Sequence, residues 1–173
     1  PFLRWVGGKT QLLPELLSFA PKEFGVYHEP FLGGGALFFA LQPKKAVLGD
    51  FNRRLINAYE CVRHHYTHVV ATMRTFTRTE ACYYEQRSIL NKEGYLHAAN
   101  PDAAARFIFL NKTCFNGLWR ENNSGEFNVP YGGDRSGKFL DEKALLDCSI
   151  AMRGDIIVKA ADFGSVQFRA ASG

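Results

Sequence analysis

A glycine-rich turn and an acidic residue downstream of it carry the clearest chemical signal in this 173-residue sequence. The turn, residues 31–35, follows a short apolar segment, and Asp50 stands at the end of the next apolar segment. Glycines let the backbone approach a ligand closely, and the start of a helix offers free N–H groups. A carboxylate placed like Asp50 can accept hydrogen bonds from both hydroxyls of a ribose. The spacing predicts a pocket for a nucleotide-type cofactor.

Apolar periodicity predicts the elements that would position these residues. We expect buried strands at residues 26–29, 46–49 and 155–159. We expect helices at residues 11–19, 34–41, 53–66, 79–91, 101–111 and 141–150. The sequence therefore predicts an α/β protein.

The middle of the chain differs in character from its two ends. Residues 117–131 are rich in Gly, Asn and Ser, which predicts a hairpin with a polar tip. We therefore expect a cofactor-binding α/β segment at residues 1–55, a helical insert with the hairpin at residues 56–140, and a return to the α/β domain at residues 141–173. The insert would serve as a recognition lobe.

Composition limits the class of protein. A content of 46% hydrophobic and 14% aromatic residues argues against disorder, and a net charge of +4 is compatible with nucleic acid as a partner. No apolar run reaches the length needed to cross a bilayer, so we expect no membrane partner. The four cysteines form no C-x-x-C pair, which indicates reduced thiols and a cytoplasmic protein.

Two other nucleotide sites are weighed against this interpretation. Gly8-Lys9-Thr10 suggests a phosphate-binding loop, but Leu3 occupies the position of its first glycine. A dinucleotide site would need a third glycine where Phe38 stands, and a large aromatic there would obstruct helix–strand packing. Both observations disfavour ATP, NAD and FAD, although a purely structural glycine turn stays possible from this segment alone.

A metal site is a further alternative. Cys61 with His65, and His64 with His68, are spaced four apart on a predicted helix, and such pairs can hold zinc. The other two ligands of a closed site are not apparent, and histidines near a helix end cap carbonyl groups well. We expect no metal.

Three segments together resemble the DNA adenine N6-methyltransferases of the Dam type, the D12 class. They read F-L-x-W-x-G-G-K at residues 2–9, E-P-F-x-G-x-G at residues 29–35, and F-N-G-L-x-R followed by G-E-F-N-V-P within residues 115–130. The resemblance runs along nearly the whole chain in the family's order. It implies a partial Rossmann-like sheet that binds S-adenosylmethionine, with a helical DNA-recognition insert carrying a β-hairpin.

The resemblance also assigns expected roles to individual residues. The expected cofactor-binding residues are Trp5, Lys9, Glu29, Phe31, Gly33, Gly35, Asp50, Asp162 and Phe163. The expected DNA-binding residues are Arg4, Asn116, Leu118, Arg120, Asn122 and Pro130. An arginine fork on guanine is worth about 1–3 kcal/mol of discrimination. The implied partner is double-stranded DNA with a GATC-type site, read by a monomer.

The family's chemistry needs a second motif, Asp-Pro-Pro-Tyr, which accepts protons from the poorly nucleophilic adenine amino group and stacks on the flipped base. The sequence contains no Pro-Pro pair, and Asn128-Val-Pro-Tyr131 lies in the predicted hairpin instead. We expect the motif just after Gly173, so that the chain is a fragment with no catalytic residue and a cofactor strand lacking its inner neighbour.

Two other functions stay open at this point. A degenerate methyltransferase would bind DNA or the cofactor without catalysis, which the missing Pro-Pro pair favours. A different α/β enzyme would use NAD or ATP, and its binding would then depend on Asp50.

Overall fold

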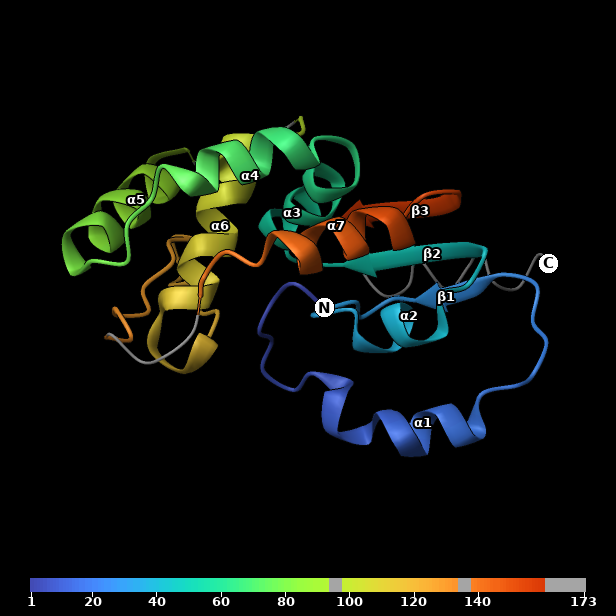
Figure 1. Ribbon diagram of the computed structural model, residues 1–173. Helices are drawn as coiled ribbons and strands as arrows, with labels where there is room; N and C mark the ends of the chain where they lie inside the picture. The colour runs from blue at the N-terminus through green and yellow to red at the C-terminus, as the bar shows by residue number, and fades with distance from the viewer. Residues whose placement is uncertain (94–97, 134–137, 161–173) are drawn as a thin grey trace.

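A computed structural model of the protein describes residues 1–93, 98–133 and 138–160. Figure 1 shows the helices and strands along the chain. In order, they are a 3₁₀ turn at Lys9–Leu12, α1 (Leu13–Phe19), β1 (Tyr27–Glu29), α2 (Ala36–Leu41), β2 (Lys45–Asp50), α3 (Arg53–His64), α4 (Tyr66–Arg74), α5 (Glu80–Glu93), α6 (Pro101–Thr113), a 3₁₀ turn at Phe115–Gly117, α7 (Glu142–Ala151) and β3 (Asp155–Ala160).

The three strands form one parallel sheet in the order β1-β2-β3. Val47 in β2 pairs with His28 on one side and with Ile157 on the other. This mixed α/β architecture confirms the predicted fold class, a partial Rossmann-like sheet. Within the described ranges, β1 pairs with β2 alone and so forms an edge of the sheet.

Side-chain caps explain where the longer helices begin. The Asn52 side chain accepts a hydrogen bond from Leu55 N at the start of α3, and Asn100 accepts one from Ala103 N at the start of α6. Pro101 occupies the first turn of α6, where a missing N–H costs nothing. Because Asn52 follows β2 by two residues, its cap turns the chain from the sheet directly into α3.

The structure corrects two sequence-based predictions. The helix expected at residues 53–66 ends at His64, because His65 leaves helical geometry with φ −129° and ψ 30°. A separate helix, α4, follows and was not predicted. The hairpin expected at residues 117–131 is held by two isolated antiparallel bridges rather than by regular strands: Glu121–Phe127 lies within it, and Cys114–Tyr131 joins its end to the residue after α6.

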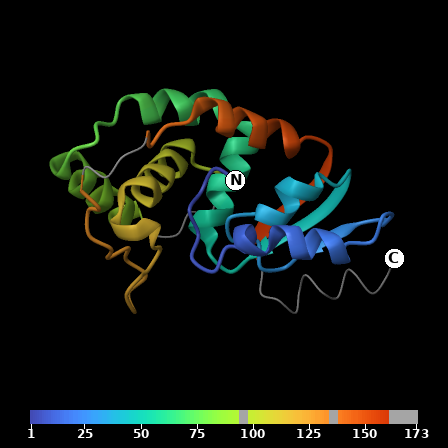
Figure 2. The same cartoon turned by 60° about the horizontal axis from the view of Figure 1, so that its bottom comes forward.

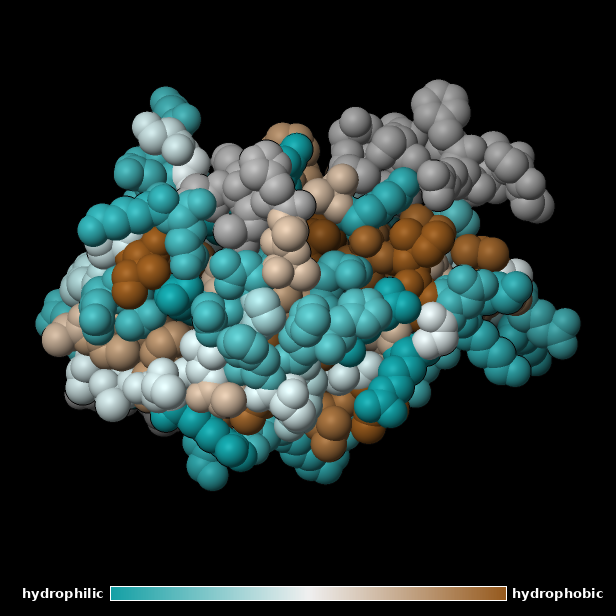
Figure 3. Space-filling model, turned by 90° about the horizontal axis from the view of Figure 1, so that it is seen from above, coloured by the Kyte–Doolittle hydropathy of each residue, from teal (hydrophilic) through white to brown (hydrophobic). Residues whose placement is uncertain are grey.

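Two hydrophobic clusters, both reaching α6, form the core of the described residues. The first joins the sheet to α3, α4, α6 and α7, and the second lies between α5, α6 and the hairpin. Phe107 and Ile108 of α6 belong to the first cluster, whereas Phe109 and Leu110 belong to the second. Seen from above, the surface of the molecule is mostly hydrophilic (Figure 3).

Figure 2 shows α1 and α2 on the near side of the sheet, with the helices α4 to α6 gathered at the opposite end of the molecule. Within the described ranges, none of the helices has the length and apolar character required to cross a membrane.

Candidate functional site

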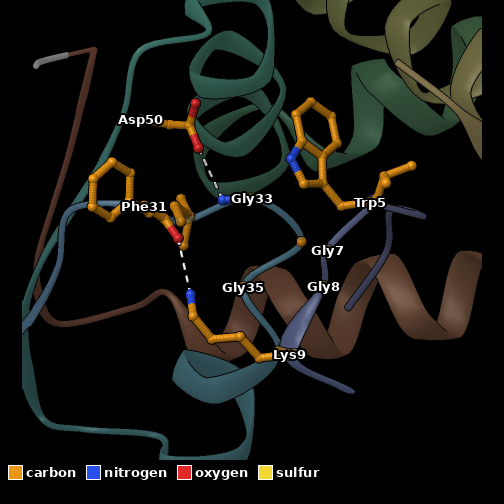
Figure 4. A pocket seen from close by; sticks show the side chains of 12 residues that line it. Trp5, Gly7, Gly8, Lys9, Phe31, Gly33, Gly35 and Asp50 are labelled. Atoms are coloured by element: carbon orange, nitrogen blue, oxygen red, sulfur yellow. Dashed lines mark hydrogen bonds between the residues drawn. The ribbon is translucent and has the colours of Figure 1, made fainter. Parts of the chain in front are cut away.

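The turn after β1 is fastened to the end of β2 by backbone and carboxylate contacts. Asp50 Oδ2 accepts a hydrogen bond from Gly33 N, and Asp50 Oδ1 accepts one from Asn52 N, each at 2.9 Å. Leu32 N donates to Gly49 O at 2.9 Å. Figure 4 shows the first of these contacts at the mouth of the site. Each Asp50 oxygen keeps a further lone pair that can accept a ligand hydroxyl.

A cavity of about 300 Å³ opens between this turn and the N-terminal segment. Trp5 and Phe31 lie on opposite sides of it, with Asp50 at one end (Figure 4). The lining consists of Trp5, Val6, Gly7, Gly8, Lys9, Phe31, Leu32, Gly33, Gly34, Gly35, Ala36 and Asp50. This volume is at the lower end of the range of small-molecule sites.

Glycine is required where the turn meets Trp5. Gly33 has φ +50°, and a Cβ there would stand 2.8 Å from Trp5 Cδ1. Any side chain at this position would push the indole ring aside. Gly33 therefore packs directly against the Trp5 ring, and both residues line the cavity.

Lys9 and Glu29 support the turn from beneath. Lys9 Nζ donates to Glu29 Oε1 at 2.7 Å and to Phe31 O at 3.0 Å, and Tyr27 OH donates to Glu29 Oε2 at 2.9 Å. Glu29 is buried and does not line the cavity. Burial, with Glu29 close by, raises the pKa of the Tyr27 hydroxyl. The structure thus places both residues as supports of the turn, and their direct contact with a cofactor stays a prediction.

Replacing Lys9 with methionine is expected to lower the free energy of unfolding by about 2 kcal/mol, because a buried carboxylate loses its cationic partner. Urea unfolding followed by circular dichroism measures the change. In the Glu29→Gln background the same replacement should cost clearly less. Equal costs in both backgrounds would contradict the ion-pair interpretation.

Two residues near the cavity were missed by the sequence reasoning. Tyr59 of α3 is fully buried, and its hydroxyl donates to Gly33 O at 3.0 Å, so that the turn is held at both its N–H and its carbonyl. Phe51 follows Asp50 in the chain and is 85% exposed. An apolar residue directly after a predicted acidic ligand was the available signal for Phe51, whereas nothing in the sequence indicates the Tyr59 contact.

The expected DNA-binding residues gather around the hairpin. Arg4 N donates to Asn111 Oδ1, and the Arg4 side chain packs on Gly117, so the N-terminal segment lies beside the start of the hairpin. Asn116 adopts a left-handed conformation with φ 54° and is exposed. Arg120, Asn122 and Pro130 are also exposed, and Leu118 is partly buried.

Side chains order the hairpin from within. Arg120 Nε donates to Asn128 Oδ1 at 2.8 Å across the two arms. Asn122 Oδ1 accepts from Ser124 N and Glu126 N, and Asn122 Nδ2 donates to Glu126 Oε2. Asn122 therefore builds the turn, and its contact with DNA stays a prediction.

Asn128-Val-Pro-Tyr131 packs on α5 and not at the cavity. Val129 O accepts from Tyr83 OH at 2.8 Å and from Arg87 at 3.1 Å. This position agrees with the prediction that the string belongs to the hairpin. Asp162 and Phe163, expected beside the cofactor, lie outside the described residues.

A comparison with known protein families shows to which family the chain belongs. The model of the D12 class N6 adenine-specific DNA methyltransferases matches residues 5–172. The chain belongs to this family. The glycine turn, Asp50 and the hairpin all fall within the matched range.

Curated relatives support the assignment to the D12 class. The Type II methyltransferase M1.LlaDCHI of Lactococcus lactis subsp. cremoris is 35% identical over 94% of this chain and 58% of its own length. The Type II methyltransferase M.MjaIII of Methanocaldococcus jannaschii is 36% identical over 94% of this chain and 62% of its own length. The DNA adenine methylase of Escherichia coli K12 is 35% identical over 76% and 47%, respectively. The chain spans about half to three fifths of the length of these three relatives.

The histidines and cysteines of this D12-class chain do not converge on a metal geometry in the described ranges. His64 stands 3.7 Å from Glu60 and His68 stands 3.0 Å from Asp102. Cys61 is buried and donates to Asn57 Oδ1. Cys61, His64 and His68 thus each contact a nearby side chain rather than a shared metal position in the described ranges.

Burial raises the pKa of the Cys61 thiol to about 12 and that of Cys114 to about 11. At pH 8 both are expected to stay protonated in the folded protein, since thiolate forms only near the pKa. We therefore expect one thiol, the partly exposed Cys82, to react rapidly with a disulfide reagent, and all four to react after unfolding. Rapid reaction of two or more thiols in the folded chain would contradict this prediction.

Proposed function

We propose that the chain binds S-adenosylmethionine in the cavity between Trp5, the turn at residues 31–35 and Asp50. The observation that carries the proposal is the Asp50 carboxylate, which closes the glycine turn through Gly33 N and still offers lone pairs for two ribose hydroxyls. Phe31, which lines the cavity, and Phe51, which follows Asp50 in the chain, are both exposed aromatic residues. When bound, the cofactor supplies an electrophilic methyl group.

We further propose that the hairpin reads double-stranded DNA, with a GATC-type site as the expected target. Arg120 and the amides at residues 116 and 122 are of the kind that contact base edges in the major groove, and the Arg4 side chain packs on Gly117. Asn128 holds the exposed Arg120 guanidinium through Nε, and a bidentate contact with a base would use the two terminal nitrogens of the fork. The net charge of +4 favours approach to DNA.

In the whole protein, these two parts would serve methyl transfer to N6 of adenine, the chemistry of the D12 class. The residues described here position the donor and the target; the groups that accept the protons of the amino group are expected in an Asp-Pro-Pro-Tyr motif, which the 173 residues do not contain. We therefore propose that this chain binds donor and DNA but does not transfer the methyl group unaided.

Isothermal titration with S-adenosylmethionine, NAD and ATP tests the cofactor. We expect heat of binding with S-adenosylmethionine alone; binding of NAD or ATP instead would overturn the proposal in favour of another α/β enzyme. Transfer of a labelled methyl group to duplex DNA tests catalysis. Robust transfer by the 173-residue chain would contradict the claim that it lacks the acceptor groups.

A non-catalytic module is the second candidate function, favoured by the missing Pro-Pro pair. Joining this chain to the C-terminal part of a relative distinguishes the two candidates. Recovery of methyl transfer in the joined protein supports the enzyme, and binding of donor and DNA without transfer supports the module.

A further inference from the structure

A buried arginine links α3, the helix after β2, to the hairpin. Arg54, in the first turn of α3, is only 4% exposed, which is rare for a charged side chain. Its Nη1 donates to Glu121 Oε1 at 3.1 Å and to Gly125 O at 2.8 Å, and its Nη2 donates to Leu90 O at 3.4 Å. One guanidinium thus joins α3, α5 and the hairpin.

The two hairpin partners flank the turn at residues 122–124. Glu121 Oε1 also accepts from Trp119 Nε1 at 3.0 Å, and Gly125 N donates to Asn122 O at 2.9 Å. Asn122 therefore sets the local shape of the turn. Arg54 sets the direction in which the whole turn points from the body of the protein.

The same arginine lies close along the chain to the candidate cofactor site. Asp50 Oδ1 holds Asn52 N, and the Asn52 side chain caps the helix in which Arg54 is the second residue. A short, hydrogen-bonded path therefore runs from the ribose-binding carboxylate to the hairpin. It fixes where the hairpin stands relative to the cavity.

A purely stabilising role would give a different result on substitution. A methionine in place of Arg54 leaves Glu121 and Gly125 O without this donor and is expected to lower stability, because only one partner of the ion pair is removed. It cannot hold the hairpin at Glu121 and Gly125. A hairpin that is free to move must be ordered on every specific encounter with DNA, which costs affinity for the correct site.

We propose that Arg54 is a positioning residue for target recognition, which holds the hairpin through Glu121 and Gly125 in the orientation that reads DNA. The proposal rests on the proposed function of the hairpin as the DNA reader. It adds a residue outside the hairpin and outside the expected contact set.

The test compares Arg54→Met with Arg53→Met in the 173-residue chain. Arg53 is the neighbouring arginine and is exposed, so its variant removes the same charge without releasing the hairpin. Fluorescence anisotropy measures the affinity for a duplex with a GATC site and for a duplex with that site scrambled. Hydrogen exchange measures protection of the turn amides of Asn122, Gly125 and Glu126.

We expect Arg54→Met to reduce the discrimination between the two duplexes at least tenfold and to accelerate exchange of the turn amides at least tenfold. Arg53→Met should change overall DNA affinity at most modestly and leave both the discrimination and the exchange as in the wild type. Arg54→Lys should restore part of both, because an ammonium can still reach one acceptor. Affinity for S-adenosylmethionine should stay within twofold in all variants.

The outcomes separate this inference from the proposed function. If the wild type discriminates between the duplexes and Arg54→Met does so equally well, the positioning role is overturned. If the wild type does not discriminate between the duplexes, the proposed DNA function fails. Hydrogen exchange then still tests the anchoring of the hairpin, and unchanged exchange of the turn amides in Arg54→Met would overturn it. Should Arg54→Met fail to fold, Glu121→Leu removes the side-chain acceptor of Arg54 and is expected to change discrimination and exchange in the same direction; its failure to do so overturns the inference.

Discussion

Alanine in place of Asp50 is expected to weaken binding of S-adenosylmethionine by about 3 kcal/mol, on the order of 100-fold. The variant loses the acceptor for two ribose hydroxyls and also frees Gly33 N and Asn52 N, which the carboxylate holds at 2.9 Å. Isothermal titration measures the affinity. Asp50→Asn, which keeps one acceptor oxygen, should bind with intermediate affinity.

Asp155→Ala is the matched control for this experiment. Asp155 begins β3, and its side chain is 67% exposed beside Lys45, so it removes a carboxylate from the sheet away from the cavity. Its affinity for S-adenosylmethionine should equal that of the wild type. An affinity of Asp50→Ala within threefold of the wild type, with the fold intact by circular dichroism, would show that the cofactor does not bind here.

Alanine at Gly35 is expected to lower the free energy of unfolding by about 3 kcal/mol. Its φ of +66° costs a residue with a side chain about 1–2 kcal/mol, and overpacking of a dense site adds about 1–3 kcal/mol. The added Cβ would stand 2.7 Å from Tyr59 Oη and 3.1 Å from Phe39 Cε2. Urea unfolding measures the loss.

Gly7→Ala separates the two causes. Gly7 has φ +72°, but a Cβ there meets nothing within 4 Å, so this variant should lose only about 1 kcal/mol from the backbone conformation. Adding Tyr59→Phe to Gly35→Ala should recover part of the stability, since the contacting oxygen is removed. Equal losses for Gly7→Ala and Gly35→Ala would contradict the steric explanation.

The sequence was sufficient to predict features that depend on neighbouring residues. Strands at residues 26–29, 46–49 and 155–159 were predicted to within one residue at each end, because short apolar segments between glycines and charges allow few alternatives. Gly33 and Gly35 adopt left-handed conformations, and the glycine turn that contains them was predicted from residue type. The same holds for Asp50 at the end of β2.

Contacts between distant segments could not be predicted. The Lys9 ammonium holds Glu29 and Phe31 O, which no spacing in the sequence indicates, while its expected contact with the cofactor stays a prediction. Arg54 reads from the sequence as a surface residue at a helix start, and its burial depends on Glu121 and Gly125. The helix break at His65 could not be predicted because no glycine or proline lies at this position.

Helix α6 has a consequence for how the protein unfolds. Neighbouring residues on this helix, Ile108 and Phe109, pack into different hydrophobic clusters. Because both clusters pack on α6, loss of packing in one cluster also removes support from the other. The helical part and the sheet should therefore unfold in one cooperative transition. The amides of α6 would then exchange only through global opening, which makes this helix the slowest-exchanging segment and the natural reporter of the protein's total stability.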